Sequence, residues 1–182
     1  MKDLRHGGFL FGMMYSMSEF IPNAAECGTD YRFETLSVES ISALLNESES
    51  AFLPSATNPT QTSNEMVESM KDDPNFQILG YEEHNQPISY IVALSHKELN
   101  TLSIGPMYIG ANHRGLGLGI AQVKEFIEYA RLQGYSCVFT KTWSRNTAAR
   151  HIFDAIGFVA TKIKLDDRVD GDSTISYRLD IT

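Results

Sequence analysis

The sequence predicts an α/β fold of the α+β kind, in which consecutive antiparallel strands are followed by alternating helices and strands. Three strand-like apolar runs come one after another at residues 76–81, 88–94 and 101–109. A glycine-rich turn at residues 112–120 then joins the last run to a segment whose apolar residues have helical spacing. Consecutive strands with short connections pair as antiparallel neighbours. The order therefore indicates one sheet that is flanked by helices.

The composition is that of an ordinary globular domain. The chain has 182 residues, of which 42% are hydrophobic and 21% are charged, and this is enough to build one hydrophobic core. Its formal net charge of −8 argues against a nucleic-acid-binding protein, which would carry a basic footprint. The two cysteines, Cys27 and Cys137, lie far apart and do not indicate a disulfide framework or a zinc site.

Residues 1–28 are interpreted as an N-terminal extension of uncertain structure, and residues 29–182 as a single domain. The extension is rich in apolar and aromatic residues without a clean period, so a docked segment, a partner contact and a disordered leader all stay open. It imitates a secretory signal peptide only loosely, because glycines interrupt its apolar part. No apolar run approaches the roughly 20 residues that span a bilayer. We therefore expect a cytoplasmic protein without a membrane partner.

The first part of the domain predicts a strand followed by two helices. Residues 31–36 alternate between apolar and polar side chains, which is typical of a strand. Ser37 is a plausible N-cap for a helix that continues through residues 38–45. Residues 54–63 have a loop composition, and a short helix is expected over residues 64–71.

The next part predicts a three-stranded antiparallel unit. The runs at residues 76–81 and 88–94 flank the polar residues 82–87, and this arrangement is typical of a hairpin. Residues 101–109 would add a third consecutive antiparallel strand.

The last part predicts two helices and three strands. Apolar residues line one helical face from Ile120 to Ala130, and Gly134 is a suitable residue to end that helix. Helical spacing returns over residues 146–156 and ends at Gly157. The strands expected between and after these helices lie at residues 137–139, 158–165 and 174–179.

The glycine turn has the features of a phosphate site. Gly115, Gly117 and Gly119 occupy every second position, so backbone N–H groups can approach an anion without interference from Cβ atoms. The helix that follows adds unpaired N–H groups and the positive end of its dipole. A dinucleotide-binding turn would instead need the spacing Gly-x-Gly-x-x-Gly and a parallel βαβ unit. A glycine turn that binds nothing is the remaining alternative.

Two motifs at this turn and beyond it resemble those of the GCN5-related N-acetyltransferase (GNAT) family. The family signature is Gln/Arg-x-x-Gly-x-Gly/Ala at a strand-to-helix turn, followed by a second acetyl-CoA motif on a later helix. The matching residues in this chain are Arg114-x-x-Gly117-x-Gly119, Asn146-x-x-Ala149 and Phe153-x-x-x-Gly157-Phe158. The resemblance implies that residues 29–182 form a GNAT-like acyltransferase domain, with a mixed, mostly antiparallel sheet splayed into a V and acetyl-CoA held between the parting strands.

The resemblance also implies roles for individual residues. The backbone of residues 107–109 would pair with the pantetheine arm of the cofactor, and the amides of residues 114–119 would hold its pyrophosphate. Asn146 would reach the pantetheine or the reacting end, and Ala149 and Phe153 would border the acetyl end. The predicted cofactor-binding residues are Met107, Tyr108, Ile109, Arg114, Gly115, Leu116, Gly117, Leu118, Gly119, Asn146, Ala149 and Phe153.

The catalytic residues stay open. Many relatives place Glu or His on the strand before the glycine turn, where this chain has residues such as Ser103 and Gly105, neither of which is a general base. The family's thiolate donor is a tyrosine at the position of Phe153, which has no proton to give. Ser103 and Tyr108 are the candidates that remain, Ser103 as a group that positions a water molecule.

Other polar residues were weighed as proton acceptors. Glu82, Glu83 and His84 lie in the expected hairpin turn, where solvated side chains are the more natural interpretation, and the same holds for His96. The Asp-rich turn at residues 166–172 lacks the final glutamate of a calcium loop, so we expect no metal site.

The sequence therefore predicts an N-acetyltransferase that moves acetyl from acetyl-CoA to a primary amine by direct attack in a ternary complex. The alternative is a non-catalytic acyl-CoA-binding or regulatory protein on the same fold. The acidic net charge favours a small cationic amine over a protein substrate. No nucleic acid is expected as a partner, and both a monomer and a small homo-oligomer are compatible with the sequence.

Overall fold

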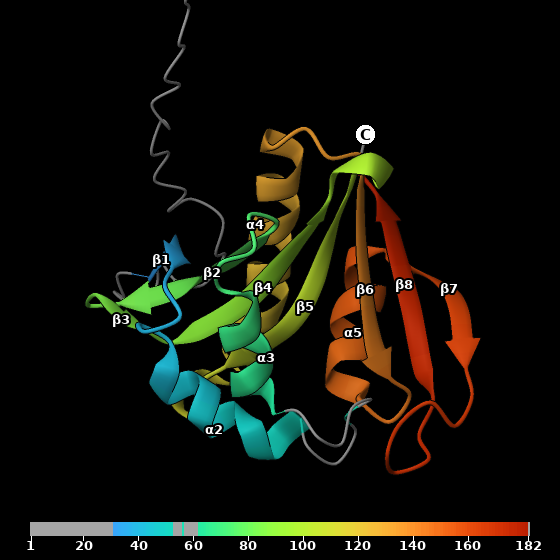
Figure 1. Cartoon of the computed structure of the whole chain (residues 1–182), viewed down its shortest axis with the longest axis horizontal. Helices are drawn as coiled ribbons and strands as arrows, with labels where there is room; N and C mark the ends of the chain where they lie inside the picture. Colours follow the sequence, from blue (N-terminus) through green and yellow to red (C-terminus); the bar gives the residue numbers. More distant parts are fainter. Residues whose placement is uncertain (1–30, 53–55, 57–61, 182) are drawn as a thin grey trace, which may run out of the picture.

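The computed structural model describes residues 31–52, 56 and 62–181, which form an eight-stranded sheet with helices on both faces (Figure 1). The sheet order is β1-β2-β4-β5-β6-β8-β7, and the short β3 pairs with β2. The strands are β1 Tyr31–Leu36, β2 Phe76–Glu83, β3 Gln86–Pro87, β4 Ser89–His96, β5 Thr101–Ile109, β6 Cys137–Trp143, β7 Val159–Lys164 and β8 Thr174–Asp180. The helices are α2 Ser42–Phe52, α3 Ser63–Met70, α4 Leu118–Leu132 and α5 Thr147–Ile156, and two 3₁₀ turns are η2 Lys97–Leu99 and η3 Ala111–His113.

The sheet is mixed and mostly antiparallel, as predicted. Strands β2, β4 and β5 are consecutive antiparallel neighbours, which confirms the three-stranded unit. The one parallel pair among the described strands is β5 with β6. A parallel pair needs a crossover, and here the crossover contains the glycine turn and α4.

The two parallel strands part soon after they meet. Residues Thr101 to Ile104 of β5 pair with β6, but β5 then continues to Ile109 without that partner. The register of β5 against β4 shifts at this point, with Gly105 and Pro106 both opposite Val92. Such a bulge bends a strand, and a proline, which has no N–H, is tolerated there. The V-shaped splay implied by the resemblance is confirmed, and Figure 1 shows β5 and β6 diverging.

Helices cover the two faces of the sheet unequally. Helices α2 and α3 pack on one face of β2, β4 and β5, whereas α4 and α5 pack on the opposite face (Figure 1). Alternate residues of β4 serve the two layers, Tyr90 and Val92 with α2, and Ile91 and Ala93 with α4. A strand that is buried on both faces becomes a continuous apolar run, which is why residues 88–94 show little alternation.

The predicted helix ends agree with the structure. Gly134, at φ 82°, follows α4, and the N–H of Tyr135 donates to the carbonyl of Ala130 at 3.0 Å. Gly157, at φ 99°, ends α5 in the same left-handed conformation. Both glycines stand where other residues would be strained.

Two predicted helix starts were wrong. Ser37 does not cap α2: its Oγ accepts from the N–H of Ser40 at 3.1 Å and closes a turn, and the helix begins only at Ser42. The resemblance implies that the helix after the glycine turn begins near Leu116, but this helix begins at Leu118. In both cases a turn with its own hydrogen bonds precedes the helix.

Two boundaries of the strands also differ from the prediction. Strand β6 continues to Trp143, because β8 pairs with it along its whole length. Glu82 and Glu83 belong to β2, and only His84 and Asn85 form the tight turn, at φ 52° and 61°.

The predicted extension at residues 1–28 and most of the loop at residues 54–63 lie outside the described residues. Among the helices that the structure describes, none is long and apolar enough to cross a membrane.

The close approach of β2 and β4 makes Gly80 essential for stability. A Cβ atom at this position would lie 2.2 Å from the carbonyl oxygen of Ser89. We expect Gly80→Ala to lower the free energy of unfolding by roughly 1–3 kcal/mol, because backbone atoms must shift to make room. Urea denaturation followed by circular dichroism measures this change.

The control for this variant is Thr35→Ala on the neighbouring strand β1, where the side chain is exposed. Its free energy of unfolding should stay within about 0.5 kcal/mol of the parent value. Equal stability of the Gly80 variant and this control would contradict the expectation.

Candidate functional site

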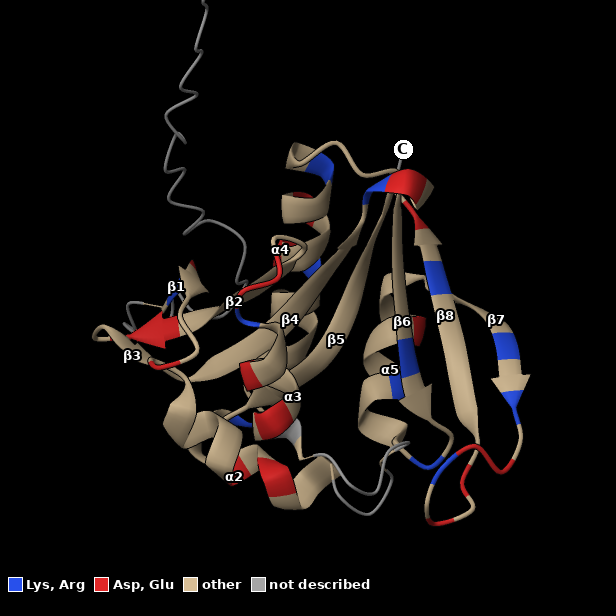
Figure 2. Cartoon of the chain, viewed as in Figure 1, with Lys and Arg blue, Asp and Glu red and all other residues tan. Residues whose placement is uncertain are grey.

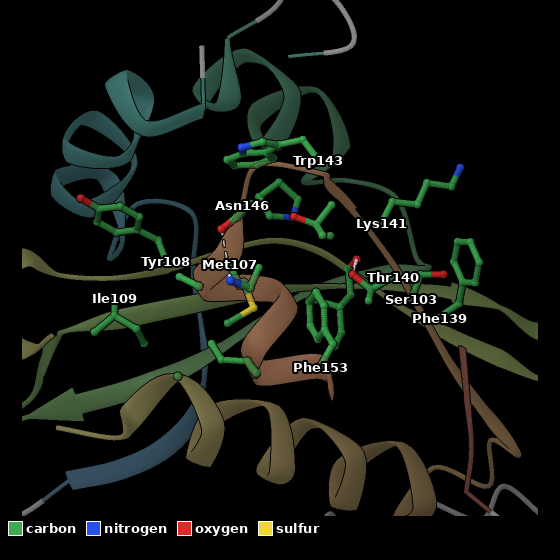
Figure 3. A pocket seen from close by; sticks show the side chains of 18 of the residues that line it. Ser103, Met107, Tyr108, Ile109, Phe139, Thr140, Lys141, Trp143, Asn146 and Phe153 are labelled. Carbon is green, nitrogen blue, oxygen red and sulfur yellow. Dashed lines mark hydrogen bonds between the residues drawn. The ribbon is translucent and has the colours of Figure 1, made fainter. Parts of the chain in front are cut away.

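A cleft of about 1410 Å³ opens where β5 and β6 part (Figure 3). Its lining comes from α2, β5, the glycine turn, the start of α4, β6 and α5. All the residues predicted to bind a cofactor except Leu116 line this cleft. The structure thus brings together two motifs that are separated by about thirty positions in the sequence.

The edge of β5 that faces the cleft carries free backbone groups. The N–H of Gly110 donates to the carbonyl of Ile88 at 2.8 Å, so the neighbouring pair Ser89–Ile109 is of the non-hydrogen-bonded kind. The N–H and C=O of Ile109 therefore point away from β4. The C=O accepts from Arg114, and the N–H is left toward the cleft. The same alternation applies to Met107, opposite Ile91. This edge can pair with an extended polar ligand, as an exposed sheet edge does.

The three glycines of the turn serve different purposes. Gly115 and Gly117 have positive φ values of 78° and 80°, and no atom lies within 4 Å of where their Cβ atoms would be. Gly119 has no such conformation, but its Cβ would lie 2.8 Å from the side chain of Ile152 on α5. The first two glycines thus shape an open cradle at the start of α4, and the third allows α4 and α5 to pack closely.

Side chains around the turn hold it in place. Arg114 donates from Nε to the carbonyl of Ile109 at 3.1 Å, and its guanidinium lies 4.9 Å from the ring centre of Tyr108. His113 Nε2 lies 3.2 Å from Glu83 Oε2. The backbone N–H groups at the start of α4, which lack partners within the helix, are left to face the cradle. An anion fits here.

Glu47 of α2 was not singled out from the sequence, yet it connects α2 to the turn. Its Oε1 accepts from the N–H of Ala111 at 2.8 Å and from the hydroxyl of Tyr108 at 3.2 Å. Nothing in the pattern of α2 distinguishes Glu47 from an ordinary exposed carboxylate. Burial raises the pKa of the Tyr108 phenol, and Arg114 opposes this shift while Glu47 adds to it. Tyr108 is therefore a neutral, already engaged donor.

Helix α5 forms the second wall of the cleft. Asn146 caps this helix, because its Oδ1 accepts from the N–H of Ala149 at 3.1 Å (Figure 3). Phe153 lines the cleft but is only 2% exposed, and its ring centre lies 5.4 Å from those of Phe158 and Tyr177. Phe153 is both a wall residue and a core residue.

Ser103 lies where the two strands begin to part. It is opposite Phe139 of β6 and is 7% exposed, and its hydroxyl has no hydrogen-bond partner in the described part of the chain. The hydroxyl of the nearby Thr140 donates to the carbonyl of Ile104 at 3.2 Å. Ser103 thus offers a hydroxyl to the cleft that no described residue engages.

Aromatic side chains border the part of the cleft beside α2. The ring centre of Phe52 lies 6.4 Å from that of Tyr108 and 6.3 Å from that of Trp143. The guanidinium of Arg168 lies 5.6 Å from the Trp143 ring. The next residue, Val169, donates from its backbone N–H to the carbonyl of Ala56 at 3.0 Å. Trp143 is therefore a residue of the cleft wall.

The charge inside the cleft is opposite to that of the whole chain. No Asp or Glu is found in the lining among the described residues, although the formal net charge is −8. Of the proton acceptors weighed from the sequence, His96 lines the cleft, whereas Glu82, Glu83 and His84 do not. The basic lining residues are His96, His113, Arg114, Lys141, His151, Arg168 and Arg178.

The Asp-rich turn is held by protein groups. Asp167 pairs with Lys164 and accepts from the hydroxyl of Thr174, and Asp172 pairs with Arg145. Within the described ranges, no group of three or more His, Cys, Asp or Glu residues is arranged to hold a metal ion.

Comparison with known proteins identifies relatives of this site and fold. The profile of the acetyltransferase (GNAT) family matches residues 39–158. N-acetylaspartate synthetase from Rattus norvegicus is 30% identical over 71 residues, which are 39% of this chain and 24% of that protein. The enzyme of the same name from Danio rerio is 30% identical over 73 residues, which are 40% of this chain and 26% of that protein. The chain thus spans about a quarter of the length of these curated relatives.

Solved structures share the fold at lower identity. An N-acetyltransferase from Staphylococcus aureus Mu50 superposes with a TM-score of 0.69 and 16% identity, covering 84% of this chain and 99% of that one. The yncA protein of Salmonella typhimurium, determined with its cofactor acetyl-CoA, has a TM-score of 0.68 and 18% identity, covering 84% and 94%.

The buried carboxylate of Asp172 makes the stability of this region depend on pH. A hydrogen bond from Ser144, together with the N–H groups of Arg145 and Ser173, holds its pKa below the ordinary value of 3.8. A carboxylate whose pKa is lower in the folded state than in the unfolded state stabilises the fold when the pH is above its unfolded-state pKa. This stabilisation is lost as the pH falls below about 4. We expect Asp172→Asn to be less stable at pH 7 and to show a shallower loss of stability between pH 4 and 2.5.

Urea titrations at several pH values test this expectation. Asp154→Asn, on the exposed surface of α5, serves as the control and should follow the parent protein. An unchanged acid dependence in the Asp172 variant would show that another carboxylate is responsible.

Proposed function

This chain belongs to the acetyltransferase (GNAT) family, and on that basis we propose that it is an N-acetyltransferase that moves acetyl from acetyl-CoA to a primary amine. The observation that carries the proposal is one continuous surface: the free edge of β5 runs into the glycine cradle at the start of α4. An extended arm that ends in a pyrophosphate matches this surface in shape and in hydrogen-bonding groups.

The proposed cofactor positions follow from this surface. Residues 107–109 would pair with the pantetheine arm, and the amides of residues 114–119 would bind the pyrophosphate. Ala149 and Phe153 would border the acetyl end, and the side-chain NH₂ of Asn146 would be free to reach the arm because Oδ1 caps α5. The cleft volume of about 1410 Å³ exceeds the ~300–1,000 Å³ of an ordinary ligand pocket, so it has room for a cofactor and an acceptor together.

The relatives support the proposal independently of the geometry of the cleft. The yncA protein was determined with acetyl-CoA, and the curated relatives are named for the synthesis of an N-acetylated amino acid. The match to the latter covers only part of each protein, so it supports the class of reaction and not a particular substrate.

We propose direct attack without a carboxylate base. The nitrogen lone pair of the neutral amine bonds to the thioester carbonyl carbon, and the tetrahedral intermediate then collapses with cleavage of the C–S bond. The backbone N–H of Ile109, which points into the cleft, would stabilise the oxyanion. The attacking nitrogen loses one proton, and the departing thiolate takes up one, either directly from that nitrogen or through water.

The positive charge of the cleft would help to deprotonate the bound amine, which is otherwise the task of a general base. Positive charges near a bound ammonium disfavour its protonated form and lower its pKa. Lys141 has no ion-pair partner among the described residues, and no carboxylate is found among the described lining residues, so a bound amine would lose its proton more easily than in water. This favours a neutral nucleophile.

One observation favours the alternative of a non-catalytic acyl-CoA-binding protein. Phe153 is buried at the position where the resemblance expects a tyrosine to protonate the thiolate. Catalysis would then depend on solvent for that proton. Persistent absence of turnover across an amine panel, together with tight CoA binding, would support this alternative.

Binding of CoA tests the cofactor assignment. Gly117→Ala puts a side chain at φ 80° in the cradle, and we expect it to weaken CoA binding about tenfold, because roughly 1 kcal/mol of backbone strain must be relieved by movement of the amides. Isothermal titration calorimetry measures the dissociation constant.

The matched control is Gly134→Ala, which has nearly the same φ of 82° but lies at the other end of α4. It should lose similar stability and keep the CoA affinity of the parent protein. Equal affinities in both variants would place the pyrophosphate elsewhere, and absence of CoA binding to the parent protein would overturn the proposal.

The pH dependence of turnover tests direct attack. We expect kcat/KM to rise about tenfold per pH unit up to the solution pKa of the acceptor amine, and kcat to level off at a lower pH, because the cationic cleft lowers the pKa of the bound amine. Ser103→Ala should keep kcat within about fivefold, since it removes only a positioning group. A further ionisation of the free enzyme between pH 5 and 8 would show instead that a protein base takes part.

A further inference from the structure

We propose that the acceptor amine also carries a carboxylate, and that Lys141 of β6 binds this carboxylate. The inference rests on the proposed transfer of acetyl to an amine and names the class of that amine. The carboxylate would bind on the side of the cleft that lies away from the proposed cofactor surface.

Lys141 stands beside the point where the strands part. It follows Thr140, the last residue of β6 that pairs with β5. Its ammonium lies 5.6 Å from the ring centre of Phe139, which is opposite Ser103. In the view of Figure 3, Phe139 and Met107 lie on opposite sides of Ser103, and the side chain of Lys141 points outward, away from Met107. Lys141 is exposed, so its ammonium lies at the rim of the cleft, on the side away from Met107.

Lys141 also projects from the face of the sheet that α5 leaves uncovered. Val138 of β6 packs into the core beneath α4 and α5, so residues of opposite parity point to the other face. Trp143 has the same parity as Lys141 and meets Phe52 of α2 on that face. A ligand that reaches Lys141 therefore enters between α2 and β6, opposite to the helices that border the cofactor.

The positive charge of Lys141 has no carboxylate to neutralise it within the described part of the chain. Its cross-strand neighbour on β8 is Ser176, and beyond Ser176 on β7 lies Lys162, which faces the same side. Lys162 also has no ion-pair partner among the described residues. Arg178 differs, because its guanidinium is bound to Asp180.

The distribution of charge over the fold also favours an anionic group on the ligand. Figure 2 shows basic positions on β6, β8 and β7, and acidic positions on α2 and α3. Cross-strand neighbours lie about 5 Å apart, so two lysines flanking one serine add their potentials at a ligand on this face. A polyamine would be repelled here. The cationic acceptor expected from the net charge of −8 therefore does not agree with the charges in the cleft.

A carboxylate close to the amine satisfies both requirements of the site. The amine must reach the thioester where the strands part, and the anion must lie within the reach of one lysine side chain from that point. The free hydroxyl of Ser103 offers a second hydrogen bond to the same group. Small amino acids and amino dicarboxylates have this arrangement of groups.

Binding of small amines to the CoA-saturated protein tests the inference. L-aspartate, L-glutamate and β-alanine serve as carboxylate-bearing probes, and spermidine serves as the cationic probe. We expect at least one of the three carboxylate probes to bind more tightly than spermidine in calorimetric titrations. Lys141→Met, which keeps the apolar stem, should weaken that binding about tenfold or more, because a charge-assisted contact is lost.

Lys124→Met is the matched control. Lys124 is an exposed lysine of α4, on the opposite side of the sheet, and its replacement should leave the affinity unchanged. Equal affinity of the Lys141 variant and the parent protein, tighter binding of spermidine, or no binding of any carboxylate probe would each overturn the inference.

The same panel separates this inference from the proposed function. Release of CoA thiol from acetyl-CoA with spermidine, but with none of the carboxylate probes, would overturn the carboxylate site and leave the transferase intact. Lys141-dependent binding of a carboxylate probe to the free protein, without turnover of any amine, would support the carboxylate site and overturn the transferase.

Discussion

The bulge at Gly105 and Pro106 is the constraint on which the rest of the site depends. Parallel pairing between β5 and β6 ends at this point, and each strand continues alone. The backbone groups of Met107 and the N–H of Ile109 are left facing a cleft instead of a neighbouring strand. Unpaired backbone groups are costly to bury, so this edge is stable only while water or a polar ligand satisfies it. Beyond Ile104, the edge of β5 that faces β6 therefore has no partner strand.

Side chains around the glycine turn secure its position and leave its backbone available. Glu47 reaches the turn from α2, Arg114 reaches back to β5, and His113 pairs with Glu83 of β2. Two elements that are distant in sequence, α2 and β2, and the preceding strand β5 therefore fix one short segment. A turn that is held from outside loses little conformational entropy when an anion binds, and this kind of preorganisation favours affinity.

Features encoded by local sequence were predictable, and features created by the pairing of distant segments were not. The three antiparallel strands and the glycines at positions 134 and 157 follow from periodicity and backbone conformation. The role of Glu47 depends on where α2 packs, and no pattern within α2 reveals it. The predicted start of α2 was wrong because Ser37 closes a separate turn before the helix.

The charge of the site shows the same limit. The net charge of −8 describes the whole surface, whereas the cleft collects its basic side chains from several segments, which meet only in the folded protein. These include the glycine turn, β6, β8 and the turn before β8. Alternation within β6 would place Lys141 on one face, but the sequence does not say which face lies open. Whether a lysine in a strand contacts a ligand is decided by the layers that cover the sheet.

The hydrogen bond between Val169 and Ala56 has a consequence for how this protein can change during evolution. It joins the loop between β7 and β8 to the segment after α2, and Phe52, Trp143 and Arg168 stand beside it. None of these residues belongs to the glycine cradle or to the free edge of β5. Mutations at Val169 and Ala56 can therefore change the proposed acceptor side of the cleft without changing the residues proposed to bind the cofactor. Because these two groups of residues are separate, the same fold can come to accept different acceptors while the proposed cofactor site stays the same.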